Sequence, residues 1–143
     1  MSKNELAQAV VQRLTELEGE LIELLGIELV EIAPNRCVTK LKVRDDLANS
    51  GRVAQGGILF ALADQAMAYA CMSNNTVGMT LSANITFTRP AQIGDTLTAT
   101  AEVSFDGGGR TLTGRAEIVN QRGITIAEVT GIWLRSREKV VNE

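Results

Sequence analysis

The chain has 143 residues, of which 45% are hydrophobic, 22% charged and 3% aromatic, with a formal net charge of −3. These values predict one globular domain over residues 1–143, and without a basic excess or stacking aromatics a nucleic-acid partner is not expected. The sequence has no histidine, which excludes a Ser-His-Asp triad, a Cys-His pair and any histidine metal site. Cys37 and Cys71 lack CxxC spacing, so we expect two buried free thiols and no metal knuckle.

The N-terminus and the apolar segments carry no targeting signal. The chain begins Met-Ser-Lys-Asn-Glu, with neither an apolar region nor a cleavage signature. Its longest weakly polar stretch is interrupted by Gly, Gln and Asp, which argues against a membrane span. We therefore expect a cytoplasmic protein without a membrane partner.

The first predicted element is an amphipathic helix over residues 2–25. Ser2 and Glu5 have the spacing of a capping box, and Gly26 stands where a C-terminal glycine would end the helix. Apolar residues follow at intervals of four and three: Leu6, Val10, Leu14, Leu17, Leu21 and Leu24.

Two extended segments are predicted next, over residues 27–33 and 37–44, with a turn at Pro34 and Asn35. A loop over residues 45–52 then leads into Ile58–Met72, which is apolar or small on every face. In a soluble protein such a run predicts a helix surrounded by other elements.

The remainder of the chain alternates with a period of two. Residues 76–88 predict a long strand with one apolar face, formed by Val77, Met79, Leu81, Ala83, Ile85 and Phe87. Strands follow near residues 96–105, 110–120 and 124–135, and the short turns between them favour an antiparallel meander. The charged tail from Ser136 onward is expected to fray. The element order predicts an α+β domain in which one antiparallel sheet curls around the central helix.

A single carboxylate is the most informative residue for function. Asp64 is the only charged residue from Val53 to Thr88, and burying it is costly unless it has a partner. It belongs to a stripe of small residues at helical spacing, namely Gly57, Ala61, Asp64, Ala68 and Cys71. The stripe allows close approach of a ligand, although helix-on-sheet packing also favours small residues. Asp64 itself is either a site residue or a structural carboxylate satisfied by hydroxyl or backbone donors.

Gln55, Gly56 and Gly57 stand at the predicted start of this helix. The first backbone N–H groups of a helix lack intrahelical partners, and the helix dipole is positive there. Glycines would let an acceptor oxygen reach those amides, as in an oxyanion-type site one to two turns from the carboxylate. A tight turn would use the same glycines equally well.

The segment from Gln55 to Ala70, which contains Gln-Gly-Gly and then Leu-Ala-Asp, resembles the signature of hotdog-fold acyl-CoA thioesterases. It resembles in particular the phenylacetyl-CoA thioesterase group, whose pattern begins His-Gly-Gly. The resemblance continues through residues 85–91, 94–97 and 119–121 and covers about residues 27–135. Gln55 departs from the family histidine: its amide can donate a hydrogen bond but cannot titrate.

The resemblance implies a homodimer or homotetramer with active sites at the dimer interface. It implies that Asp64 acts as general base or nucleophile, and that the amide of Gly56 or Gly57 polarises the thioester carbonyl. It also implies that Ser82 orients water and that Asn49 belongs to the site. Read without the resemblance, Ser82 is one polar strand position and Asn49 a turn former.

The family binds the CoA moiety near two turns, which correspond here to Arg89-Pro90 and Gly109-Arg110, with Arg137 as a further candidate. Arginine suits phosphate, although each of these could equally be a solvated surface charge.

The leading hypothesis is hydrolysis of an acyl-CoA or aryl-acyl-CoA to free acid and CoA, without a metal or organic cofactor. The alternative is a non-catalytic hotdog module that binds acyl-CoA. The isolated Asp64 favours the enzyme. Hydratase chemistry on this fold usually needs an Asp-His pair, which this sequence lacks. The identity of the acyl group is not predicted.

Overall fold

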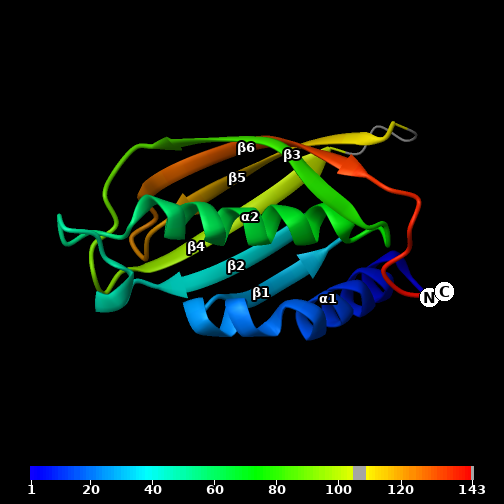
Figure 1. Ribbon diagram of the computed structural model, residues 1–143, viewed down its shortest axis with the longest axis horizontal. Helices are drawn as coiled ribbons and strands as arrows, with labels where there is room; N and C mark the ends of the chain where they lie inside the picture. Colours follow the sequence, from blue (N-terminus) through cyan, green and yellow to red (C-terminus); the bar gives the residue numbers. More distant parts are fainter. Residues whose placement is uncertain (105–108, 143) are drawn as a thin grey trace.

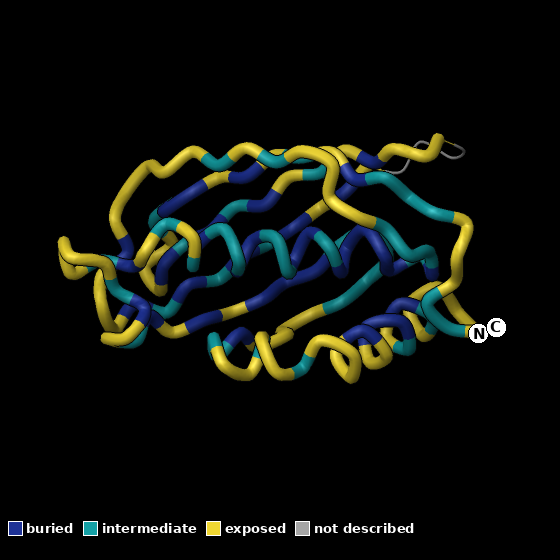
Figure 2. The backbone as a smooth tube through the Cα atoms, in the orientation of Figure 1, coloured by how far each residue is buried: buried dark blue, intermediate teal, exposed yellow. Residues whose placement is uncertain are grey.

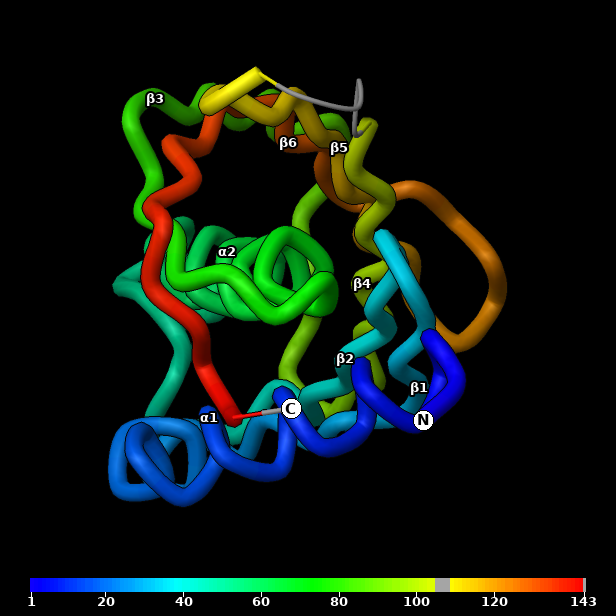
Figure 3. The backbone as a smooth tube through the Cα atoms, turned by 90° about the vertical axis from the view of Figure 1, so that its right-hand side faces the viewer, coloured from blue at the N-terminus to red at the C-terminus, as the bar shows by residue number. Residues whose placement is uncertain are grey.

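The computed structural model describes residues 1–104 and 109–142. Helix α1 spans Lys3–Leu25, the 3-10 helix η1 Asp45–Leu47 and helix α2 Gly56–Met72. The strands are β1 (Glu28–Ala33), β2 (Arg36–Lys42), β3 (Gly78–Phe87), β4 (Thr96–Ser104), β5 (Thr111–Val119) and β6 (Thr125–Arg135). All pairings in the sheet are antiparallel, and the sheet curls around α2 (Figures 1 and 3). The predicted α+β architecture is confirmed. Within the described residues, no helix combines the length and apolar character needed to cross a bilayer.

Helix α1 begins and ends where the sequence predicts. Ser2 and Glu5 form the capping box, and Gly26 ends the helix in the left-handed conformation with φ 77°. Its apolar face is covered unevenly, as Figure 2 shows. Val10 and Leu14 are buried, and so are Ala7 and Val11, whereas three leucines of the C-terminal half are exposed: Leu17, Leu21 and Leu24.

Helix α2 is covered on one side only. Its inner face is buried, through residues such as Leu62, Ala63 and Ala66. Ala61, Asp64 and Ala68, by contrast, are partly exposed. The prediction that other elements surround this helix is therefore wrong for one side, because a single curled sheet covers only part of the helix circumference.

The position of β3 in the sheet also differs from prediction. The strand order is β1-β2-β4-β5-β6-β3, so β4, β5 and β6 form a meander but β3 pairs with β6 at an edge. The connection after β3 crosses to the middle of the sheet and passes the start of α2, where Ala54 N–H donates to the Ala91 carbonyl over 2.8 Å. A full four-stranded meander was the wrong prediction, because eight residues are long enough for a crossover instead of a hairpin turn. The edge position leaves Met79 and Leu81 exposed.

The C-terminal tail is anchored, and the expectation that it frays is wrong for residues 136–142. Ser136 N–H donates to Val77 O over 2.8 Å, and Val77 N–H donates to Glu138 O over 2.9 Å. Val140 and Val141 pack against the core. Asn75 holds this end of the tail: its Oδ1 accepts from Val140 N at 3.0 Å and Val141 N at 2.9 Å, and its Nδ2 donates to Val141 O at 2.9 Å.

We expect Asn75→Ala to lower the free energy of unfolding by about 2–4 kcal/mol, because Asn75 is fully buried and its loss removes three hydrogen bonds to partly buried backbone groups of the tail. Urea unfolding monitored by circular dichroism measures the change. Asn74→Ala is the matched control, since Asn74 makes one part-buried side-chain hydrogen bond, to Asn35. Equal stabilities of the two variants would contradict the anchoring role.

Candidate active site

The first turn of α2 offers one backbone amide to a ligand. Gln55 is the N-cap, and its Oε1 accepts from Gly57 N over 2.6 Å. Gly56 N–H has no acceptor among the described residues. Side chains approach both glycines closely: a Cβ at Gly56 would lie 3.0 Å from Phe87 Cζ, and one at Gly57 would lie 2.7 Å from Gln55 Oε1. Gly56 is therefore the freer of the two predicted carbonyl donors, while Gln55 retains its Nε2 group as a further donor.

Asp64 lies in the middle of α2, partly buried, on the side that the sheet leaves uncovered. Thr80 Oγ1 donates to Asp64 Oδ1 over 3.3 Å and is the one donor to this carboxylate within the described residues. Burial raises the pKa of the Asp64 carboxyl; the Thr80 hydrogen bond opposes this effect and the charge of Glu18 adds to it. Glu18 belongs to α1, where it accepts from Gln65 Nε2 over 3.0 Å. A carboxylate so placed is a stronger base than an exposed one.

A bulge in β3 decides which hydroxyl reaches Asp64. Thr80 is opposite buried Trp133, whereas Ser82 is opposite exposed Ile132, and the register shifts between them. Ser82 therefore lies in a groove on the outer face of the sheet, together with Asn84, Thr113 and other side chains. The structure does not bring Ser82 to Asp64. Sequence analysis missed Thr80 because strict alternation places it on the same face as Ser82, and no turn residue marks the bulge.

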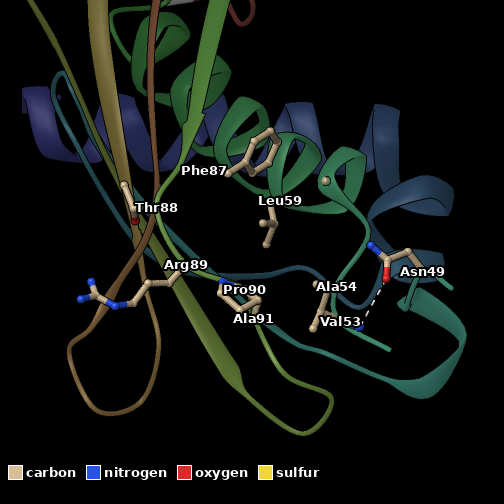
Figure 4. Close-up of a pocket in the computed structure, with 10 residues that line it drawn as sticks. Asn49, Val53, Ala54, Leu59, Phe87, Thr88, Arg89, Pro90 and Ala91 are labelled. Carbon is tan, nitrogen blue, oxygen red and sulfur yellow. Dashed lines mark hydrogen bonds between the residues drawn. The ribbon is translucent and has the colours of Figure 1, made fainter. Parts of the chain in front are cut away.

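A cavity of about 370 Å³ lies beside the start of α2 (Figure 4). Its lining comprises Asn49, Val53, Ala54, Gly56, Leu59, Phe87, Thr88, Arg89, Pro90 and Ala91. Asn49 Oδ1 accepts from Gly51 N at 2.9 Å and Val53 N at 3.4 Å, so Asn49 does form a turn. Its amide nitrogen points toward the first turn of α2 in Figure 4 and is available to a ligand.

The predicted CoA-binding residues lie at two ends of the sheet. Arg89 follows β3, and in Figure 4 its guanidinium points away from the cavity. Gly109 and Arg110 contact Arg135, which is paired with Gly78 at the start of β3. The ten residues of β3 span about 33 Å, so one chain does not bring these groups together.

The structure also places the predicted Arg137 and the two cysteines. Arg137 lies in the anchored tail, near the Gly78 end of β3, and is exposed. Residues 105–108, which include the end of the strand predicted over 96–105 and most of the turn predicted after it, lie outside the described residues. Cys37 and Cys71 are buried and free, as expected, and burial raises the pKa of each thiol to about 12. In the part of the chain that the structure describes, no group of three His, Cys, Asp or Glu side chains could hold a metal ion.

The carboxylate and the free amide are on the same helix but well apart. Asp64 and Gly56 are separated by eight residues, or about 12 Å along the helix axis. A thioester carbonyl bound to Gly56 N–H would therefore be out of reach of Asp64 in the same chain.

A six-stranded antiparallel sheet wrapped around one long helix defines the hotdog fold. The structure of the Escherichia coli PaaI protein from the phenylacetic acid degradation operon matches it with a TM-score of 0.85 and 33% identity, covering 94% of this chain and 98% of that one. The family model described as Thioesterase superfamily matches residues 52–127. The chain belongs to this superfamily. The E. coli acyl-coenzyme A thioesterase PaaI is 39% identical over 107 residues, which is 75% of this chain and 76% of that protein.

A hypothetical thioesterase from Streptococcus pneumoniae, solved with coenzyme A, matches with a TM-score of 0.74 and 26% identity, over 79% of this chain and 90% of that one. Two further structures of that protein carry alanine in place of an aspartate and of a threonine 16 residues further along. Asp64 and Thr80 are also 16 residues apart.

Proposed function

We propose that the protein hydrolyses the thioester of an acyl-CoA to the free acid and CoA. The observation that carries the proposal is Asp64: a partly buried carboxylate with a raised pKa, held by Thr80 on the uncovered side of α2. The E. coli relative, which is named an acyl-coenzyme A thioesterase, and the CoA complex of the pneumococcal neighbour support an acyl-CoA substrate.

In this mechanism Asp64 takes a proton from a water molecule whose oxygen attacks the thioester carbon. The carbonyl oxygen becomes an oxyanion, which accepts hydrogen bonds from Gly56 N–H and Gln55 Nε2. When the carbonyl re-forms, the C–S bond breaks and CoA leaves as the thiolate, which receives the proton that Asp64 took from water, so that the Asp64 carboxylate is regenerated. Direct attack of Asp64 on the carbonyl carbon, through an anhydride that water hydrolyses, uses the same groups. Thr80 is a positioning residue for the carboxylate in both routes.

We infer that each site is completed by a second copy of the chain, in a homodimer or a tetramer of such dimers. Because Gly56 and Asp64 are about 12 Å apart on one helix, an antiparallel pairing of two α2 helices would bring the Asp64 of one chain to the Gly56 of the other. The stripe containing Ala61 and Ala68 leaves room for this approach, and the exposed edge of β3 offers apolar residues to the partner.

Antiparallel pairing of the two β3 edges would also favour the binding of CoA. It would bring the partner subunit's Arg110 from the Gly78 end of its strand toward Arg89 at the Phe87 end of the first strand. Guanidinium groups from both chains would then be available to the phosphates of one CoA molecule.

A panel of acyl-CoA esters assayed for thiol release tests the proposal directly. Release above the uncatalysed rate for at least one ester is the expected result. Saturable binding of those esters by calorimetry without thiol release would support the alternative, a non-catalytic acyl-CoA-binding module.

We expect Gln55→Ala to lower kcat by about 10- to 10³-fold, because it removes one donor to the oxyanion. Gln55→His should keep or raise activity, since imidazole also presents an N–H, and it alone should add a group that titrates near neutral pH. Thermal melting of each variant measures the stability lost with the Gln55 N-cap, which we expect to be about 1 kcal/mol. If Gln55→Ala turns over its best substrate at the parental rate, Gln55 is only a capping residue.

A further inference from the structure

Phe87 forms one wall of the cavity beside Gly56. It is the last residue of β3, and its side chain is turned toward the first turns of α2 (Figure 4). Its ring lies against Gly56, since a Cβ there would be 3.0 Å from Phe87 Cζ and 3.3 Å from Cε1. Phe87 is nevertheless 52% exposed, so much of the ring remains free for contact.

The remaining lining is apolar apart from a few polar groups. Leu59, which is buried, and Val53, Ala54, Pro90 and Ala91 contribute aliphatic surface. The Gly56 amide and the Asn49 side chain are the polar groups at the helix start. At about 370 Å³, the volume is near the lower end of the range for small-molecule pockets. A cavity of this kind suits a compact apolar group that carries one hydrogen-bond acceptor.

Gly56 N–H and the Phe87 ring lie in the same cavity, which constrains where the acyl group of a bound thioester can lie. A carbonyl oxygen that accepts from Gly56 N–H lies about 2.7–3.1 Å from the nitrogen. Gly56 and Phe87 line the same cavity, and a Cβ at Gly56 would lie 3.0 Å from Phe87 Cζ, so an acyl group that enters the cavity from this carbonyl has the Phe87 ring as one of its walls.

We propose that Phe87 is a specificity-determining residue, whose ring contacts the acyl group and favours a planar ring close to the carbonyl over a linear aliphatic chain of similar size. The inference rests on the proposed function. Aromatic pairs gain from offset-stacked and edge-to-face contacts beyond the area that they bury, whereas an aliphatic chain gains only from the area.

The test compares kcat/KM for phenylacetyl-CoA with kcat/KM for hexanoyl-CoA in the parent, Phe87→Leu and Phe87→Tyr. Phe87→Leu keeps an apolar side chain without the ring and should lower the phenylacetyl-to-hexanoyl ratio by about 3- to 10-fold. Phe87→Tyr keeps the ring and should hold the ratio within about twofold of the parent. Leu17→Met, at an exposed apolar position of α1 outside the cavity lining, should leave the ratio unchanged.

An unchanged ratio in Phe87→Leu overturns the inference, and so does an equal loss in Phe87→Tyr. Either outcome leaves the proposed function intact, because both esters are still hydrolysed. If the parent hydrolyses no acyl-CoA ester, the proposed function fails first. Calorimetric binding of the same two esters to the same variants then tests the ring contact by itself, with the same expected order of ratios.

Discussion

Asp64→Asn should fold normally and lose about 10²- to 10⁴-fold in kcat for thioester hydrolysis, because the amide cannot accept the proton from water or attack the carbonyl. Asparagine is close in size to aspartate and can still accept a hydrogen bond from Thr80, so little change in packing is expected. Thiol release under saturating acyl-CoA measures the loss, and circular dichroism measures folding. Glu16→Gln, which neutralises an exposed carboxylate of α1, is the matched control and should keep parental activity.

The pH dependence of the parent enzyme tests the same assignment. Asp64 must be deprotonated to act, so activity should fall as the pH drops through its pKa. Burial raises that pKa above the ordinary aspartate value of 3.8. The acid limb of the pH–rate profile should therefore lie at a higher pH than it would for an exposed aspartate. With no histidine in the chain, no imidazole contributes to the limb. Parental activity in Asp64→Asn, or a loss explained by unfolding, would contradict the catalytic assignment.

Mixing two inactive variants should restore activity if each site draws on two chains. In a heterodimer of Asp64→Asn with Gly56→Val, one site carries both defects and the other carries neither. Random exchange of subunits should therefore recover about a quarter of parental activity, which is a rise of tenfold or more over either variant alone. Co-refolding of the two variants followed by a thiol-release assay measures the recovery.

Sedimentation of the mixture and of each variant supplies the control, since both should form the same oligomer as the parent. If the mixture stays as inactive as its components while the oligomer forms, the carboxylate and amide of one site come from a single chain. A parent that sediments as a 15.3 kDa monomer and is fully active would contradict the two-chain site altogether.

Local sequence signals identified most of the elements and singled out Asp64 as the candidate catalytic carboxylate. Ser2, Glu5 and Gly26 mark the ends of α1, and the structure confirms them within one residue. Capping and helical periodicity depend on neighbours within a turn or two, so they can be read without knowledge of the fold. Asp64 stood out for a similar reason: a lone charge in a long apolar segment is visible in the sequence itself.

Tertiary structure alone decided how these elements meet. It placed β3 beside β6, left one side of α2 uncovered, and used buried Asn75 to anchor the tail. The bulge in β3 put Thr80, and not Ser82, beside Asp64. Strand partners and register depend on contacts between residues far apart in the sequence, and one extra residue in a strand reverses the face of each side chain that follows.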